Sequence, residues 1–310
     1  MRIAIFGSNG FIGSHLSNYL SQSSCMILCM VREKSDLSKI EKLKSKYSNN
    51  KLNYCIFDPD NLDKAFKKEK IDIVINLMSY GVNQDDRNEK IANRVNVEIP
   101  VNLFKIASKY KVKNFIHFGS SQEYEGQEYI CESTEKKPQS LYGKTKRDGC
   151  NACIEEYGKN KSCKLTILRP FSIYGEYESE KKLIPSLLTS IKKQTKLSLT
   201  GGLQERNYLY IEDFNKYVHL MITKINSLAY VNYNIGSSNN IQIKEISKII
   251  CDITKKSGNS LEWGKVSYRE NEVIKFKADL SRLYNEIGKF EEYTMHNALQ
   301  KMQTFMDEQS

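Results

Sequence analysis

The chain has 310 residues, of which 40% are hydrophobic, and its 47 Lys and Arg against 37 Asp and Glu give a formal net charge of +10. This length and apolar content suit one large α/β unit or two packed lobes, and they exclude a disordered or fibrous chain. No stretch approaches eighteen consecutive apolar residues, and the start of the sequence lacks a secretory pattern. We therefore expect a cytoplasmic protein without a membrane partner.

Short apolar runs alternate with longer amphipathic segments in the first part of the chain. Runs typical of strands are 2–6, 26–31, 52–57, 71–77, 114–119 and 164–170. Five or six apolar residues bounded by helical patterns indicate parallel strands with crossover helices on both faces. The sequence therefore predicts an α/β fold with a doubly wound parallel sheet of the Rossmann type.

The alternation of short apolar runs and amphipathic segments becomes less regular after about residue 170. Helical patterns at 184–194 and 212–225 alternate with strand-like runs near 207–211 and 230–236. We predict a dinucleotide-binding Rossmann domain over residues 1–168. Residues 169–310 should form a smaller, interleaved α/β lobe that binds substrate, with segments near 205–225 returning to the first domain.

The excess of lysine is spread along the chain, with its densest runs at 34–51 and 67–70. Such runs are typical of solvated helix faces, so we predict no nucleic-acid partner. A basic protein also suits a substrate that carries pyrophosphate.

Eight cysteines are scattered through apolar and helical segments without a compact framework, which indicates reduced thiols. Cys150 and Cys153 form an isolated Cys-x-x-Cys with no second ligand pair at suitable spacing. The sequence therefore predicts no metal site.

A glycine-rich turn follows the first predicted strand directly, in the string GSNGFIG. Glycines let the backbone approach a pyrophosphate, and the N-terminus of the following helix favours its negative charge. The predicted cofactor contacts here are Gly7, Ser8, Asn9, Gly10, Phe11, Ile12 and Gly13.

The end of the second predicted strand bears on the choice of cofactor. An acidic residue there would bind the ribose 2′-hydroxyl of NAD, whereas an arginine would accommodate the 2′-phosphate of NADP. Val31 stands where the acid is expected and Arg32 follows, although Glu33 would serve if the register differed by two. We predict NADP(H), with NAD(H) as the alternative.

The string LYGKTK, residues 141–146, places Tyr142 and Lys146 on one helix face, and HFGSSQEYEG at 117–126 precedes it at the end of a strand. Together with the glycine turn, these stretches resemble the extended short-chain dehydrogenase/reductase (epimerase/dehydratase) family over nearly the whole chain. The resemblance implies that Ser121 binds the substrate oxygen, that Tyr142 is the acid/base, and that Lys146 also bridges to the nicotinamide ribose. A tyrosine with a pKa of about 10 is a poor acid/base at neutral pH, and we expect the positive charge of the lysine to lower that pKa.

The same resemblance assigns further positions. The cofactor contacts that it implies are Asp58 at the adenine, Leu77, Met78 and Ser79 after the fourth strand, Asn96 on the following helix, and Pro170 and Ser172 near the nicotinamide. The substrate contacts that it implies are Tyr80, Ser121, Gln122, Lys182, Arg206 and Arg269, of which the two arginines would bind the diphosphate.

Three reactions share these parts: 4-epimerisation, 4,6-dehydration and reduction of a 4-keto sugar. Family dehydratases carry Asp and Glu after the hydroxyl, whereas this chain has Gln122 and Glu123. Glutamine cannot replace a carboxylic acid in proton transfer, although Glu123 remains a candidate base.

We predict NADPH-dependent reduction of the 4-keto group of a nucleotide-linked 4-keto-6-deoxy sugar, by similarity to bacterial reductases of surface-polysaccharide or deoxysugar biosynthesis. The alternatives are an NAD-dependent nucleotide-sugar 4-epimerase or 4,6-dehydratase and, more remotely, a non-catalytic cofactor-binding protein. The family also implies a homodimer through the Tyr142 helix and the helical region 86–110.

Overall fold

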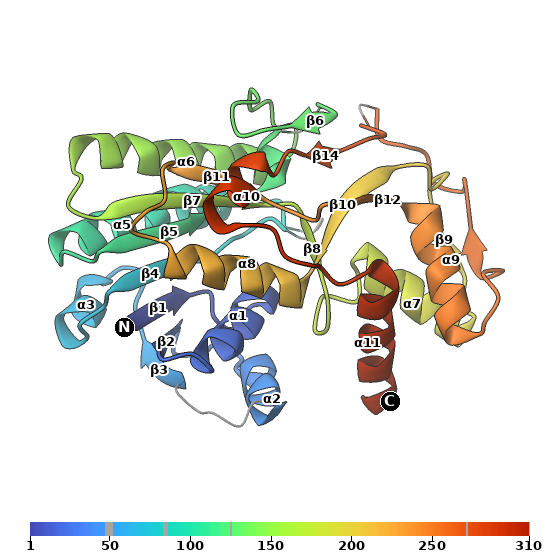
Figure 1. Cartoon of the computed structure of the whole chain (residues 1–310), viewed down its shortest axis with the longest axis horizontal. Helices are drawn as coiled ribbons and strands as arrows, with labels where there is room; N and C mark the ends of the chain where they lie inside the picture. Colours follow the sequence, from blue (N-terminus) through green and yellow to red (C-terminus); the bar gives the residue numbers. More distant parts are fainter. Residues whose placement is uncertain (47–51, 83–85, 125, 271, 310) are drawn as a thin grey trace. The chain divides into compact units, whose positions relative to one another are not determined.

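The computed structural model describes residues 1–46, 52–82, 86–124, 126–270 and 272–309 (Figure 1). The end of the basic run at 34–51 and Asn271, beside Arg269, lie outside these ranges. The chain forms two compact units. The first comprises Met1–Glu125, Glu135–Pro170 and Val218–Asn234, and the second comprises Gly126–Thr134, Phe171–Tyr217 and Ile235–Ser310.

A seven-stranded sheet is the centre of the first unit, with the strand order β11-β7-β5-β4-β1-β2-β3. Its strands are β1 Arg2–Phe6, β2 Met26–Val31, β3 Leu52–Ile56, β4 Ile73–Asn76, β5 Asn114–Phe118, β7 Lys164–Pro170 and β11 Asn232–Ile235. The pairings from β3 through to β7 are parallel, with Ile3 of β1 opposite Ile27 of β2 and Ile73 of β4. The chain winds outward from β1 in one direction and from β4 in the other, as in doubly wound sheets.

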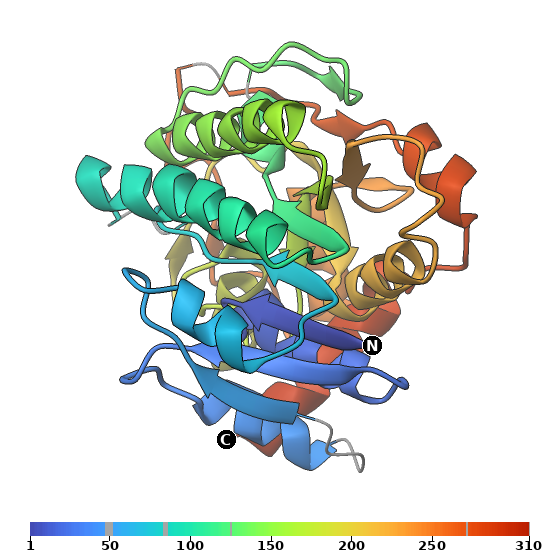
Figure 2. The same ribbon diagram turned by 90° about the vertical axis from the view of Figure 1, so that its left-hand side faces the viewer.

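Helices cover both faces of this sheet. One face packs against α1 Phe11–Ser21, which also contacts α2 Ser38–Lys46. The other packs against α3 Asp63–Lys68, α5 Ile99–Lys109 and α6 Leu141–Lys159, with α5 and α6 side by side in Figure 2. The short helix α4 Glu89–Asn93 continues through a π-helical turn η1, Arg94–Glu98, into α5.

Burial on both faces explains the uninterrupted apolar strands. Ala4 and Phe6 of β1 pack in one core with Leu103 and Phe104 of α5. Ile3, the residue before Ala4, is fully buried as well. A strand covered by helices on both sides gains from apolar residues at every position. The predicted α/β fold class is confirmed.

The second unit contains a three-stranded sheet in the order β12-β10-β8. Its strands are β8 Ser172–Tyr174, β10 Glu205–Tyr210 and β12 Asn240–Gln242, and the short pairs are β9 Leu197–Ser198 with β13 Leu261–Glu262 and β6 Tyr129–Ile130 with β14 Lys277–Ala278. The helices are α7 Leu183–Lys193, α9 Ile243–Thr254, α10 Ser281–Ile287 and α11 Met295–Glu308. Helix α8, Ile211–Thr223, begins in the second unit and ends in the first.

The division of the chain differs in detail from the predicted domains. The first unit continues to Pro170 rather than to residue 168, and the returning segment is Val218–Asn234 rather than 205–225. Residues 205–210 stay in the second unit because β10 pairs with β8 and β12. Gly126–Thr134 also belongs there, because β6 pairs with β14.

All eight cysteines are free, and both Cys150 and Cys153 are buried in the core of the first unit. Burial raises the pKa of the Cys153 thiol to about 12, so that it stays protonated at neutral pH. Within the described ranges, no group of His, Cys, Asp and Glu side chains is arranged to hold a metal ion. Over the same residues, no helix has the length and apolar character needed to cross a membrane.

Candidate active site

Three segments meet at one edge of the large sheet. The glycine turn follows β1, Leu77–Gly81 follows β4, and Gly119–Ser121 follows β5. Because β1, β4 and β5 are neighbouring parallel strands, the segments that follow them meet at the carboxyl edge of the sheet. The winding direction reverses between β1 and β4, and ligands of open α/β sheets bind at such a reversal.

The glycine turn is shaped by close backbone approaches. Gly7 has φ +81°, a left-handed conformation, and a Cβ on it would lie 3.0 Å from backbone atoms of Leu77 and Met78. A Cβ on Gly13 would lie 2.1 Å from the Gly7 carbonyl oxygen, which no side chain can tolerate. Helix α1 starts after Gly10 without a side-chain cap, so its first N–H groups are not occupied by a cap. This cradle fits the pyrophosphate of a dinucleotide.

The other predicted residues of the turn differ in orientation. Ser8 is fully buried and its hydroxyl lies 3.4 Å from the carbonyl oxygen of Met30, so that only its backbone can serve a cofactor. The Asn9 amide donates to the carbonyl oxygen of Asp36 at 3.3 Å, while Phe11 and Ile12 are half-buried at the start of α1. These contacts fix the turn against β2 and the segment that follows it.

Arg32 and Asp58 follow neighbouring strands, β2 and β3. Arg32 is exposed, and its backbone N–H donates to the Ser35 hydroxyl at 3.0 Å. Asp58 is also exposed, and its carboxylate accepts the backbone N–H of Asp60 at 2.9 Å. Both side chains are accessible, and their roles toward a cofactor stay predictions.

The segment after β4 is clamped by Asn96. Its side chain accepts the Tyr80 N–H at 2.9 Å and donates to the Tyr80 carbonyl oxygen at 2.8 Å and to the Thr145 hydroxyl at 2.9 Å. Asn96 is fully buried, so the predicted direct contact with a cofactor is wrong. It instead holds Tyr80 of this segment against α6. Leu77, Met78 and Ser79 of the same segment remain at least partly accessible.

A second buried link joins β4 to β5. The Asn76 amide nitrogen lies 3.2 Å from Nδ1 of His117, and its oxygen accepts the Met78 N–H at 3.2 Å. Burial, helped by the charges of Lys146 and Arg169, holds the pKa of His117 well below its usual range, so the ring is neutral. Sequence reasoning missed this link, for which a histidine inside an apolar strand was the available signal.

The catalytic prediction rests on Tyr142 and Lys146, near the start of α6. The Ser140 hydroxyl caps this helix by accepting the Gly143 N–H at 3.0 Å. Tyr142 is half-buried, and a Cβ on Gly81 would lie 3.5 Å from its own Cβ. Lys146 lies on the same helix face and is almost fully buried. Desolvation lowers the pKa of the Lys146 ammonium group.

The side chain of Ser120 lowers the pKa of Tyr142, and its Oγ accepts the Gln122 N–H at 3.2 Å. Ser121 is buried at the start of the 3₁₀ turn η2, Ser121–Tyr124. The predicted contact of Ser121 with the substrate oxygen stays a prediction. Gln122 is exposed, and its side-chain oxygen lies 3.4 Å from the Ser140 hydroxyl.

The pKa of Tyr142 differs from the expectation. Burial raises it to about 12, the Ser120 hydrogen bond opposes this rise, and the Glu123 charge adds to it. The predicted lowering of the Tyr142 pKa is wrong, because desolvation of the phenolate dominates. Tyr142 therefore keeps its proton at neutral pH and can act as a proton donor.

Glu123 is not accessible to a substrate. Its carboxylate is fully buried and accepts Arg169 Nε–H at 2.7 Å and the Ser120 N–H at 2.9 Å. The predicted role of Glu123 as a catalytic base is wrong, because an ion pair inside the core occupies it. Sequence reasoning missed Arg169, although an arginine within the apolar run of β7 requires a buried partner.

The remaining predicted residues lie at Pro170 and in the second unit. Pro170 ends β7, and Ser172, at the start of β8, is exposed. Lys182 is the N-cap residue of α7. Arg206 on β10 pairs with Glu272 and donates to the carbonyl oxygen of Ile274 at 3.2 Å. Arg269 is exposed.

The ion pair with Glu272 distinguishes Arg206 from Arg269. A phosphate bound by Arg206 would compete with Glu272, whereas Arg269 presents an accessible side chain. The predicted contacts of Arg269 and Arg206 with the diphosphate stay predictions.

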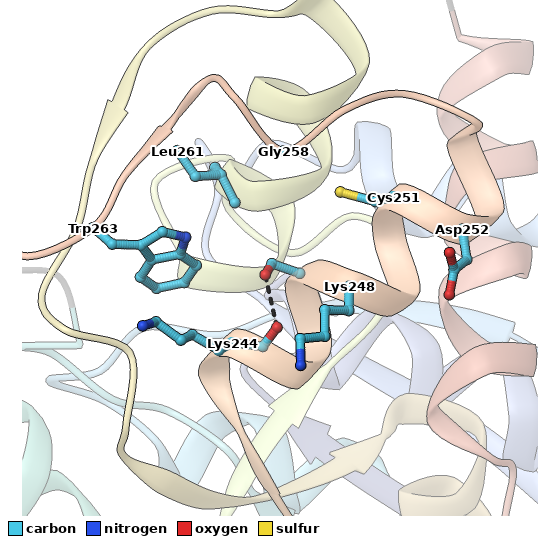
Figure 3. Close-up of a pocket in the computed structure, with 8 residues that line it drawn as sticks. Lys244, Lys248, Cys251, Asp252, Gly258, Leu261 and Trp263 are labelled. Carbon is cyan, nitrogen blue, oxygen red and sulfur yellow. Dashed lines mark hydrogen bonds between the residues drawn. The ribbon is translucent and has the colours of Figure 1, made fainter.

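A separate pocket of about 290 Å³ lies in the second unit between α9 and the strand β13 (Figure 3). Lys244, Lys248 and Cys251 line it from α9, opposite Leu261 and Trp263. The Lys244 ammonium lies 5.6 Å from the centre of the Trp263 ring. None of the predicted catalytic or cofactor residues lines this pocket.

A glycine cradle at the reversal point of a doubly wound sheet, beside Tyr142 and Lys146 on one helix, is the pattern of a nicotinamide-dependent oxidoreductase of the short-chain dehydrogenase/reductase class. The chain belongs to the NAD dependent epimerase/dehydratase family, whose model matches residues 3–236. It is an enzyme of that family.

Several relatives carry names of nucleotide-sugar enzymes. The chain is 29% identical over 272 residues to dTDP-D-glucose 4,6-dehydratase of Dictyostelium discoideum, covering 82% of this chain but only 62% of that protein. It is 23% identical over 293 residues to CDP-abequose synthase of Yersinia pseudotuberculosis, covering 94% and 98%. UDP-glucuronic acid 4-epimerase of Bacillus cereus, solved with NAD, has the same fold, with a TM-score of 0.84, 23% identity and 99% of each chain covered.

Proposed function

We propose that this enzyme reduces the 4-keto group of a nucleotide-linked 4-keto-6-deoxy sugar with NADPH. The proposal takes the substrate class from the names of the relatives and the reaction from the residues around Tyr142. Such a product would enter a surface polysaccharide or a deoxysugar-bearing compound.

The state of the carboxylates is the observation that carries the choice of reaction. Dehydration needs a base that removes a proton from the sugar. Glu123, the carboxylate predicted for this role, is instead bound by Arg169. Gln122 offers no exchangeable carboxyl group. Reduction requires only a proton donor and a group that orients the keto oxygen, which Tyr142 and Ser120 provide.

In the proposed reaction, bound NADPH supplies the hydride. The Ser120 hydroxyl donates a hydrogen bond to the C4 oxygen of the sugar, and the Tyr142 phenol transfers its proton to that oxygen as the alkoxide forms. The Lys146 ammonium then stabilises the tyrosinate that is left. The raised pKa of Tyr142 keeps the donor protonated until that step.

Arg32 supports the choice of NADPH. It is exposed directly after β2, where no carboxylate takes the place expected for binding a ribose 2′-hydroxyl. A guanidinium group there would pair with the 2′-phosphate. The glycine cradle serves either cofactor.

The first test is turnover by Tyr142→Phe with NADPH and a panel of 4-keto-6-deoxy nucleotide sugars. We expect kcat to fall by about 10² to 10⁴-fold, because positioned proton transfer is lost, while NADPH affinity stays within about twofold. A variant that retains more than a tenth of wild-type turnover would contradict the role of Tyr142.

Analysis of the nicotinamide carried by freshly purified protein separates the reductase from the epimerase. A reductase exchanges its cofactor in each turnover, so we expect protein free of nicotinamide that binds NADPH more tightly than NADH. Tightly retained NAD⁺, which an epimerase needs, would overturn the proposal.

A further inference from the structure

We propose that the pocket between α9 and Trp263 is a further ligand site, which binds a planar ring that carries a phosphate group, as in a mononucleotide. All of its lining residues belong to the second unit, and none of them is a predicted catalytic, cofactor or substrate contact. The inference therefore goes beyond the proposed function and does not depend on it.

Trp263 presents the surface for the planar ring. It is half-buried, and Gly202 packs directly against it. A Cβ on Gly202, whose φ is +71°, would lie 2.4 Å from Cζ3 of Trp263 and 2.8 Å from Cγ of Lys244. Only glycine fits there, and its close approach fixes the position of the indole. A fixed aromatic side chain that stays partly accessible is a platform on which nucleobases stack.

Two lysines of α9 present positive charge to the same pocket. Lys244 and Lys248 lie one helical turn apart, and the Lys244 ammonium lies 5.6 Å from the centre of the Trp263 ring. Among the described residues, no carboxylate pairs with either ammonium group, although Asp252 also lines the pocket. Like charges at this spacing repel each other, and a phosphate bound between them would offset this repulsion.

The rest of the lining limits the size and polarity of the ligand. The volume, about 290 Å³, is close to the lower limit for small-molecule sites, so the pocket suits a mononucleotide better than a dinucleotide. Leu261 and Cys251 add apolar surface from opposite sides (Figure 3). The Ser247 hydroxyl is already used, because it donates to the carbonyl oxygen of Lys244 at 2.7 Å. A ligand would therefore be recognised by the tryptophan and the two ammonium groups.

The fluorescence of Trp263 measures occupancy of this pocket, because it is the only tryptophan in the chain. Nicotinamide-free protein is titrated with CMP, UMP, dTMP and AMP, and with the parts of a nucleotide: cytidine, ribose 5-phosphate and inorganic phosphate. We expect saturable quenching by mononucleotides and at least about tenfold weaker binding of each part, which lacks either the ring or the anion. Inorganic phosphate that binds as tightly as the mononucleotides would overturn the inference.

A double variant tests the two lysines against a matched control. Lys244→Met with Lys248→Met should weaken mononucleotide binding by about tenfold or more, since both charge-assisted contacts to the phosphate are lost. Lys193→Met changes an exposed lysine of α7 that does not line the pocket, and it should leave the affinity within about twofold. Equal affinities of the double variant and the control would refute the site.

The predicted diphosphate contact, Arg269, needs a control of its own. Tyr268, the residue before it, contacts the turn beside Trp263: a Cβ on Gly201 would lie 2.5 Å from its hydroxyl, and the Leu203 N–H donates to that hydroxyl at 3.4 Å. A nucleotide bound at Arg269 would therefore also change the fluorescence. We expect Arg269→Met to keep the response to mononucleotides. A response that is lost in Arg269→Met and kept in the double lysine variant belongs to the diphosphate site and overturns the inference.

Cys251 gives a second readout that does not depend on fluorescence. Its partly accessible thiol lines the pocket, whereas that of Cys131, also partly accessible, does not. A saturating mononucleotide should slow the alkylation of Cys251 by iodoacetamide by about fivefold or more and leave that of Cys131 unchanged, as followed by peptide mass spectrometry. Unchanged alkylation of Cys251, with or without quenching of Trp263, would show that the pocket does not bind the nucleotide.

Discussion

Ser120 and Ser121 differ in what their side chains contact, although they are adjacent and both buried. The side chain of Ser120 lowers the pKa of Tyr142, and the backbone N–H of Ser120 donates to Glu123. Ser121 starts the turn η2. We therefore assign the orientation of a substrate oxygen beside Tyr142 to Ser120, whereas the family pattern implies Ser121.

Alanine substitution of each serine tests this assignment. We expect Ser120→Ala to lower kcat/KM by about 10² to 10³-fold, because a hydrogen-bond donor to the developing alkoxide is lost. Ser121→Ala should stay within about threefold of wild type. The reverse order of effects in steady-state kinetics would restore Ser121 to the role that the family pattern implies.

At the scale of elements, the strand β1, its turn and helix α1 form one rigid cradle. The approach of α1 to the turn depends on Gly13, where a Cβ would overlap the Gly7 carbonyl oxygen. Gly10 is different, because a Cβ there would lie 3.4 Å from the same oxygen, an ordinary contact. The close approach of α1 to the turn therefore requires a glycine at position 13 but not at position 10, although both belong to the same evenly spaced motif.

Calorimetric titration of two variants with NADPH and NAD⁺ measures this difference. Gly13→Ala should weaken binding of either cofactor by more than about tenfold, because α1 must move away from the phosphate site. Gly10→Ala is the matched control and should weaken binding by less than about threefold. Equal affinities for the two variants would show that the cradle does not bind the pyrophosphate.

At the scale of the whole molecule, the surface of the first unit bears on assembly. Ile91 of α4 and Ile154 of α6 are 43% and 37% exposed, and the two helices pack against each other. These are the regions through which the family resemblance implies pairing of two chains. Exposed apolar side chains on neighbouring helices favour a helical interface between two copies.

We expect sedimentation velocity to give a dimer for the wild type and a monomer for Ile154→Glu, since a charge buried in the interface is costly. Circular dichroism should show the same helix content for both proteins. A wild-type monomer at micromolar concentration would refute the homodimer.

The large sheet, the glycine turn and the Tyr142–Lys146 pair could be predicted from the sequence, because each depends on local periodicity or spacing within one segment. Tertiary contacts, by contrast, pair Glu123 with Arg169, 46 positions away in the chain. They also decide that Asn96 clamps Tyr80 and Thr145. The physical reason is that a buried polar group must find its partner wherever the fold brings one, and local pattern carries no record of distant partners.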